Sequence, residues 1–165
     1  MKTPKKAKTF RKLGFTYLET AEIVIALNKL MANYIVHYHK LRNFHWNVVG
    51  ANFFELHEQF EIEYEKTKEN IDIIAERIRV FGIKPRYTLK QFLSLSGVKE
   101  VEEELTSFQM VQEVLKDFSI IHDAILEVTD HALDAGDIAT EDILMDLIRN
   151  LEKRHWMYTV CLKKG

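Results

Sequence analysis

Residues 45–76 read HWNVVGANFFELHEQFEIEYEKTKENIDIIAE, and this stretch carries two separated groups of metal-ligand side chains. The first group is His57 with Glu61, and the second is Asp72 with Glu76. At ~3.6 residues per turn, all four fall within about 100° on one helix face. At a rise of ~1.5 Å per residue, the two groups lie about 22 Å apart, whereas a metal bond is near ~2 Å. Each group is therefore only half of a coordination sphere.

A second copy of the same helix would complete both groups. If two copies pack antiparallel about a two-fold axis near Lys66 and Thr67, the first group of one copy meets the second group of the other. Two identical sites then form at the interface of a symmetric dimer. His45 precedes this helix and is placed to supply one more imidazole.

The composition predicts a single domain that works in a reducing compartment. The chain has 165 residues, of which 47% are hydrophobic, and only two prolines, which suits one domain with a sizeable core. Its single cysteine, Cys161, excludes an internal disulfide framework. The chain lacks an apolar run long enough to cross a membrane, and no apolar segment follows the basic N-terminus as in a secretory signal. We therefore expect a cytoplasmic protein without membrane contact.

The N-terminus is strongly basic. Six basic residues fall in the first twelve positions: Lys2, Lys5, Lys6, Lys8, Arg11 and Lys12. They leave 17 basic and 25 acidic residues in the rest of the chain, a net charge of −8. A basic arm on an acidic body predicts non-specific contact with a phosphate polyanion, and a flexible solubilising arm is the alternative. We place the arm at residues 1–14 and the folded domain at residues 15–165.

Apolar residues recur every three or four positions in four long segments, which predicts four amphipathic helices. We expect these helices at residues 17–47, 53–81, 106–134 and 138–162. Asn52 and Asp137 are expected to cap the second and fourth of them, and the expected core includes Met110, Met145 and Trp156. A short helix at 88–95, capped by Thr88, connects the second and third. The predicted fold is all-α, an antiparallel four-helix bundle with a short helix in the crossover.

The quoted stretch also resembles a known family. HWNVVGANFFELHEQFE at 45–61 and YEKTKENIDIIAERI at 64–78 are similar to the signature of Dps, the DNA-binding protein from starved cells. Dps is a mini-ferritin subgroup of the ferritin-like superfamily. The resemblance continues through KPRYTLKQFLSLS at 84–96 and RHWMYTVCL at 154–162. It spans about residues 17–162, leaves the basic arm outside, and implies a ferritin-like fold.

The resemblance implies a metal site shared between subunits. It makes His45, His57 and Glu61 ligands from one subunit, and Asp72 and Glu76 ligands from its two-fold mate, in agreement with the helical counting. The family more often has Asp at position 61. Imidazoles and carboxylates without thiolates favour Fe(II) over zinc or copper. The resemblance further implies oxidation of two Fe(II) ions to Fe(III), with hydrogen peroxide, and a ferric mineral stored in a hollow dodecamer.

Three acidic residues near the start of the last helix are candidates for an iron entry pore. The resemblance implies that Asp137, Asp142 and Asp146 line three-fold pores, and helix capping is the alternative for part of this charge. Trp46, next to His45, is a candidate electron donor or radical sink in catalysis, and a packed interface aromatic is its alternative.

Other ligand-type residues have plainer interpretations. Glu152 and His155 have the Glu-x-x-His spacing of di-iron bundles, but such bundles need a second copy of that motif, so we expect both at the surface. Structural or surface roles are expected for the remaining histidines: His37, His39, His122 and His131. Arg77 and Arg79 compete with a metal as partners for the acidic pair that ends the quoted stretch.

Two further functions remain open at this point. A protein that compacts nucleoid DNA through its basic arm, with vestigial iron oxidation, is the main alternative to a protein that oxidises iron and protects DNA from oxidative damage. A metal-free bundle that acts as an adaptor is the third. If the arm is the working part, deletion of residues 2–12 should abolish the retardation of DNA, and iron oxidation should be unchanged under either of the first two functions.

Overall fold

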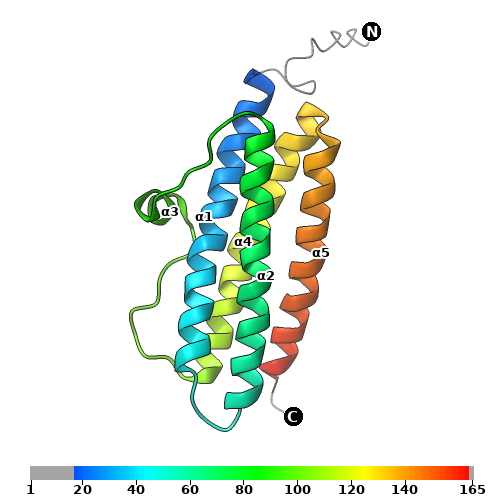
Figure 1. Ribbon diagram of the computed structural model, residues 1–165. Coiled ribbons are helices and arrows are strands. Elements are labelled where there is room, and N and C mark those ends of the chain that lie inside the picture. Colours follow the sequence, from blue (N-terminus) through cyan, green and yellow to red (C-terminus); the bar gives the residue numbers. More distant parts are fainter. Residues whose placement is uncertain (1–16, 164–165) are drawn as a thin grey trace.

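The computed structural model describes residues 17–163, which form five helices (Figure 1). They are α1 (Tyr17–Asn47), α2 (Phe53–Val80), α3 (Leu89–Leu95), α4 (Ser107–Ala135) and α5 (Ile138–Cys161). The four long helices run side by side as a bundle, and the short α3 lies beside α1 in the connection between α2 and α4. The predicted all-α bundle with a short crossover helix is confirmed. The basic arm predicted at residues 1–14 lies outside the described residues.

Local sequence decides where most of the helices begin and end. Thr88 and Thr106 each accept a backbone hydrogen bond in a reciprocal capping box at the starts of α3 and α4. Gly136 ends α4 in the left-handed conformation, with φ 66°, and Asp137 caps α5 as predicted. Asn52 occupies the N-cap position of α2 as predicted, but its side chain makes no capping hydrogen bond.

One hydrophobic cluster fills the space between the four long helices. Fully buried side chains come from all four, among them Phe44, Phe60, Ile74, Ile121 and Leu144. Met110 is buried as predicted, but the core positions predicted for Met145 and Trp156 are wrong, since they are 51% and 62% exposed. Successive helix residues point about 100° apart, so a neighbour of the buried Leu144 faces away from the core.

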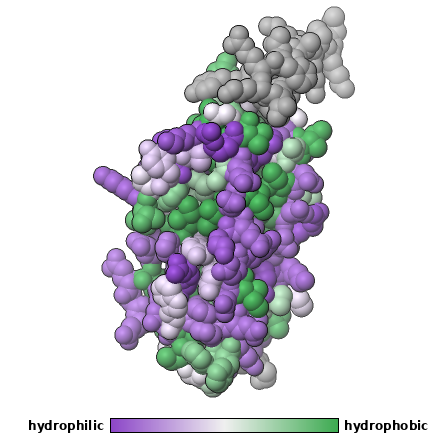
Figure 2. Space-filling model, viewed as in Figure 1, coloured by the Kyte–Doolittle hydropathy of each residue, from purple (hydrophilic) through white to green (hydrophobic). Residues whose placement is uncertain are grey.

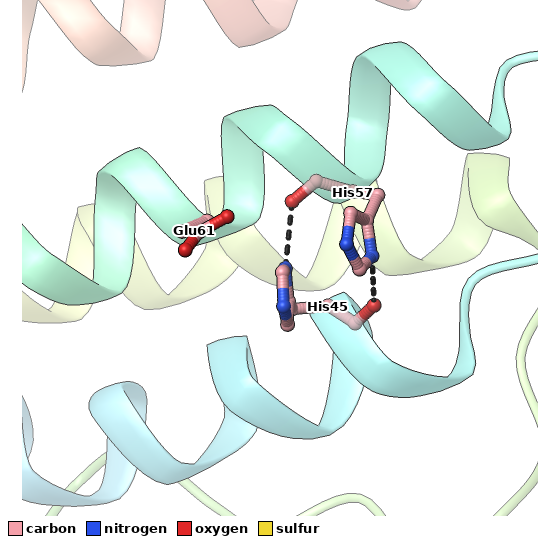
Figure 3. Close-up of side chains that lie close together, drawn as sticks. All are labelled: His45, His57 and Glu61. Atoms are coloured by element: carbon pink, nitrogen blue, oxygen red, sulfur yellow. Dashed lines mark hydrogen bonds between the residues drawn. The ribbon is translucent and has the colours of Figure 1, made fainter.

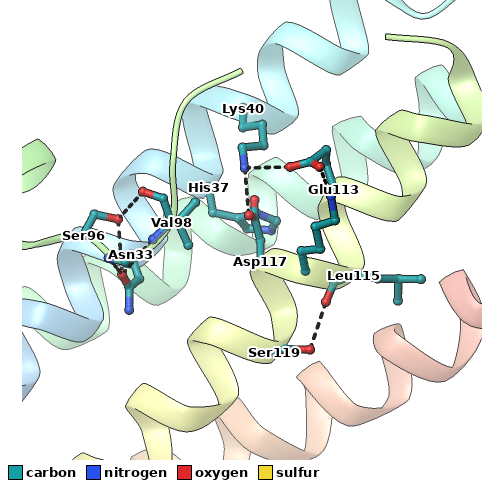
Figure 4. A network of polar contacts seen from close by, with 11 residues as sticks. Asn33, His37, Lys40, Ser96, Val98, Glu113, Leu115, Asp117 and Ser119 are labelled. Atoms are coloured by element: carbon teal, nitrogen blue, oxygen red, sulfur yellow. Dashed lines mark hydrogen bonds and ion pairs between the residues drawn. The ribbon is translucent and has the colours of Figure 1, made fainter. Parts of the chain in front are cut away.

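A polar network crosses the interior of the bundle (Figure 4). Lys40 of α1 donates to Asp117 of α4 at 2.8 Å, and Asp117 also accepts from His37 Nδ1 at 2.8 Å. All three side chains are almost completely buried. Arg154 of α5 forms a second ion pair with Glu63 of α2. These buried carboxylates therefore have cationic partners within the same chain.

The surface of α2 carries large exposed apolar side chains. Ile62, Ile73 and Val80 are each at least 40% exposed and fall within about 20° of one another around the helix. In Figure 2, apolar groups gather in patches between polar ones on the face that includes α2. This apolar stripe adjoins the face that carries the two predicted half-sites, and exposed apolar patches mark interaction surfaces. Across residues 17–163, every helix is too short or too polar to be a membrane span.

Candidate metal centre

His45, His57 and Glu61 come together where α1 ends and α2 begins, at the end of the bundle where α5 also ends (Figures 1 and 3). His45 lies in the last turn of α1, while His57 and Glu61 occupy successive turns near the start of α2. One donor atom of each residue lies within 4.8 Å of the others. In the described part of the chain, no other group of three such residues is this close.

Two reciprocal hydrogen bonds orient the imidazole rings. His45 Nδ1 lies 2.8 Å from the backbone oxygen of His57, and His57 Nδ1 lies 2.7 Å from the backbone oxygen of His45. A carbonyl oxygen only accepts, so each Nδ1 carries the hydrogen. The Nε2 atom of each neutral ring then keeps its lone pair, which is the tautomer that a metal ligand needs.

Packing holds both rings in place. The two imidazoles stack with centroids 3.8 Å apart and planes 21° apart. The ring of Phe53 stacks on His57 at 5.1 Å, and His45 is only 8% exposed. The rings are therefore positioned by the fold before any metal arrives, as a precise site requires.

Tyr64 is a neighbour of this site that the sequence interpretation missed. Its hydroxyl donates a long hydrogen bond of 3.5 Å to Glu61 Oε1, and its ring meets His45 edge-on at 5.4 Å. Partial burial, followed by the Glu61 carboxylate, raises the pKa of Tyr64, so the hydroxyl stays a neutral donor. The available signal was its position three residues after Glu61, which places both on one helix face.

The second half-site does not join the first within one subunit. Asp72 and Glu76 are exposed further along α2, and their side chains make no hydrogen bond or ion pair with any residue of the range 17–163. The alternative in which Arg77 and Arg79 neutralise them is wrong. Arg77 donates to Asp137 at 2.6 Å, and Arg79 donates to a backbone oxygen in the following turn. Two like charges one helix turn apart thus remain uncompensated, which is mildly destabilising without a cation.

The bundle interior offers no competing metal site among the described residues. Ferritin-like di-iron bundles project carboxylates and histidines from their four helices into the core. Here the core carboxylates Asp117 and Glu63 already pair with Lys40 and Arg154. The metal-type half-sites are instead at the surface, where a second subunit can reach them.

Trp46 lies beside the centre without being buried. It is 61% exposed, and the guanidinium of Arg42 lies 4.7 Å from the centroid of its ring. An exposed indole next to His45 suits both of its predicted roles, an electron donor and an aromatic at an interface.

The three predicted pore residues differ in their surroundings. Asp137 is 1% exposed and is held by Arg77, by the Thr140 hydroxyl and by its own role as the cap of α5. Its carboxylate is therefore committed to the fold. Asp142 and Asp146 are exposed, and Asp146 pairs with Arg149 one turn later.

Comparison with known proteins places the chain in a family. The family model named Ferritin, a ferritin-like domain, matches residues 24–165. The "DNA protection during starvation protein" of Brevibacillus brevis is 39% identical over 141 residues, which cover 86% of this chain and 95% of that protein. The chain belongs to the Dps family of ferritin-like proteins.

Other relatives agree in sequence, and solved Dps structures agree in fold. "General stress protein 20U" of Bacillus subtilis is 42% identical over 136 residues, covering 82% of this chain and 94% of that protein. The structure of the Vibrio cholerae Dps protein superposes with a TM-score of 0.89 at 32% identity, covering 98% of this chain and all of that one. It is described as a member of a superfamily of ferritin-like diiron-carboxylate proteins. For Staphylococcus aureus Dps the TM-score is 0.85 at 37% identity, with 88% and 97% covered. The predicted ferritin-like fold is thus confirmed.

Proposed function

We propose that this chain is the subunit of a hollow Dps-like cage that oxidises Fe(II) and stores the ferric product. In this proposal the cage is a dodecamer, and each iron site lies between two subunits related by a two-fold axis. The observation that carries it is the pair of imidazoles whose Nδ1 atoms are held by backbone carbonyls, so that two Nε2 lone pairs are available beside the Glu61 carboxylate.

The donor set suits iron. His45, His57 and Glu61 of one subunit, with Asp72 and Glu76 of its mate, combine imidazoles with three carboxylates and contain no thiolate, a mixture that suits Fe(II). The unpaired state of the acidic residues supports a partner that brings positive charge. The apolar stripe of α2 supports a second subunit covering this face.

The reaction needs two Fe(II) ions for each molecule of hydrogen peroxide. Each Fe(II) loses one electron, and the two electrons with two protons cleave the O–O bond and give two water molecules. Paired transfer avoids the hydroxyl radical that a single electron would release from peroxide. We assign Trp46, which is exposed directly beside His45, the role of a reserve electron donor. Where only one Fe(II) reacts with a peroxide molecule, the indole would supply the second electron and become the radical in place of a released hydroxyl radical.

Iron reaches the cage interior, in this proposal, past the exposed carboxylates of Asp142 and Asp146. Asp137 shapes that entrance only indirectly, by capping α5 and holding Arg77. The setting is the cytoplasm.

Stopped-flow measurement of Fe(II) oxidation tests the proposal. With hydrogen peroxide as oxidant, the double variant His45→Ala/His57→Ala should oxidise Fe(II) about 100-fold more slowly than wild type, about 2.7 kcal/mol of lost stabilisation. His131→Ala is the matched control, because it also removes an imidazole, but one on α4 that does not belong to the group of His45, His57 and Glu61. The same comparison with dioxygen identifies the working oxidant. An unchanged rate in the double variant contradicts the site.

DNA binding is a second candidate function. It is supported by the six basic residues of the arm and by relatives named for DNA protection during starvation. Deletion of residues 2–12 should abolish retardation of DNA in a gel and leave Fe(II) oxidation at the wild-type rate. Retained DNA binding would exclude the arm as the DNA-binding element.

A further inference from the structure

A second group of metal-ligand side chains lines a pocket between α4 and α5. The pocket has a volume of about 330 Å³, and α4 and α5 pack side by side around it. His122 and Asp123 enter it from α4, and Glu152 and His155 enter it from α5. The last two are the Glu-x-x-His pair that lacks a second copy in the sequence. The fold places a histidine of another helix beside them instead.

The distances in the pocket suit a shared ion better than hydrogen bonds. His122 Nε2 lies 3.7 Å from Glu152 Oε1, and His122 Nδ1 lies 3.9 Å from Asp123 Oδ1. Both separations are too long for a hydrogen bond. Bonds from zinc to nitrogen or oxygen are ~2.0–2.2 Å, so two ligands of one ion stand about 3–4 Å apart. His122 and Glu152 are therefore already at a separation that one metal ion can bridge.

The surroundings leave these ligands free. Arg154 lies between Glu152 and His155 in the sequence, but its guanidinium is directed to Glu63 and Gln59. It therefore does not neutralise the pocket. The imidazole of His155 is exposed and has no hydrogen bond or ion pair with the residues described, so it can turn toward His122. Residues three apart on a helix share a face, which keeps His155 and Glu152 on the same side.

We propose that this pocket binds one divalent transition metal ion through His122 Nε2, the Glu152 carboxylate and His155. Two imidazoles and a carboxylate suit borderline ions such as Zn²⁺, and they do not suit the hard ions Mg²⁺ and Ca²⁺. Asp123 lies 3.9 Å from Nδ1 of His122, so its negative charge is on the opposite side of the ring from Nε2, the proposed metal ligand. Water completes the coordination. The site is separate from the proposed iron site on α1 and α2.

Calorimetric titration with Zn²⁺ tests this site in the full-length protein. The background is the variant His45→Ala/His57→Ala, so that zinc cannot bind those imidazoles. We expect one zinc ion per chain in the α4–α5 pocket. His155→Ala or Glu152→Gln, added to that background, should weaken its binding at least tenfold. Unchanged stoichiometry and affinity in both variants would overturn the proposal.

His131→Ala is the matched control in the same background. His131 also lies on α4, but its Nδ1 faces a single carboxylate, Glu22, at 3.4 Å. Zinc affinity should be unchanged in this variant. An equal loss with His131→Ala and His155→Ala would also overturn the proposal, because it would show general surface binding.

Fe(II) oxidation provides an independent readout. In the wild-type background, His155→Ala should keep the full oxidation rate, because it does not touch His45, His57 or Glu61. The proposed zinc site can therefore be refuted without refuting the proposed ferroxidase function, and the reverse also holds.

Discussion

Two buried histidines of α1, His37 and His45, show how differently polar groups find their partners in the middle of the bundle and at its end. Each holds its Nδ1 in a hydrogen bond of 2.8 Å, His37 with Asp117 and His45 with a backbone oxygen. Around His37 the charges balance inside one chain, because Lys40 also binds Asp117. Around His45 the charges do not balance inside one chain, because the Glu61 carboxylate and the lone pairs of the two imidazoles have no cation.

The two groups of polar side chains differ in where their charge partners come from. A buried charge is tolerated only with a partner, so the interior network has to be closed by the fold itself. His37 Nε2 and Asn70 Oδ1 are buried without a protein partner, and both line a cavity of about 30 Å³, the size of one or two water molecules. The surface half-sites can remain open until a second subunit and a metal ion arrive.

The largest expected effect comes from breaking the interior network. Asp117→Ala removes the acceptor of His37 and the nearer anionic partner of Lys40, whose buried charge then keeps only the more distant Glu113 carboxylate, at 3.7 Å. We expect it to lower the free energy of unfolding by about 3–5 kcal/mol, measured by chemical denaturation. Asp123→Ala, an 86% exposed carboxylate on the same helix, is the control and should change stability by less than about 0.5 kcal/mol. If Asp117→Ala lowers the free energy of unfolding by less than about 1 kcal/mol, the Lys40–Asp117 ion pair is not what stabilises the buried charges.

The second largest effect is expected at the two half-sites of the proposed iron centre. His45→Ala/His57→Ala and Asp72→Ala/Glu76→Ala should each lose about 100-fold in Fe(II) oxidation rate, or about 2.7 kcal/mol. Cages assembled from equal amounts of the two variants should recover about a quarter of the wild-type rate. Half of the random dimers are mixed, and each mixed dimer holds one intact site of two. Failure to recover activity in mixed cages, with assembly verified, would contradict a site shared between subunits.

A smaller effect is expected at Tyr64. Tyr64→Phe removes the hydroxyl that hydrogen-bonds Glu61, a contribution of about 1 kcal/mol at most. Anaerobic titration should show Fe(II) binding weakened by no more than about fivefold. Tyr38→Phe is the matched control, because the Tyr38 ring packs on Tyr64 at 5.9 Å. Equal effects of both variants would assign the change to ring packing instead of the hydrogen bond.

The smallest expected effect is a pH dependence of the interior. Burial, followed by the Glu63 carboxylate, raises the pKa of Tyr158 above its ordinary 10.0. The folded state then keeps this phenol neutral while the unfolded chain ionises, so its contribution to stability is complete below pH 10.0 and falls as the pH rises further. Tyr158→Phe should flatten the loss of stability between pH 10 and 11, relative to wild type. Tyr87→Phe, at an exposed tyrosine, should leave that slope unchanged.

Much of the fold was predictable from local pattern. The four long helices follow from apolar spacing, and the ends at Thr88, Gly136 and Asp137 follow from capping chemistry. Errors arose where a residue's neighbours along the helix decide its exposure. Met145 and Trp156 are apolar and yet lie away from the core, because they are adjacent to, or two residues from, a buried position.

The interior network was not predictable, because it joins residues far apart in the chain. Lys40 and Asp117 are 77 positions apart, and Glu63 and Arg154 are 91 apart. Nothing in the local pattern of a lysine and an aspartate tells which distant charge each will meet. The ion pair of Arg77 with Asp137 was not predictable for the same reason, because the two residues are 60 positions apart.

The sequence by itself determined the helices, their order and the one-face spacing of His57, Glu61, Asp72 and Glu76, because these depend only on the geometry of a helix turn. Tertiary structure alone decided the tautomers of His45 and His57, since each ring is oriented by a carbonyl on the neighbouring helix. It also decided which carboxylates are neutralised inside the bundle and which stay open at its surface. Charge pairing depends on distances between helices, and those distances exist only once the helices have packed.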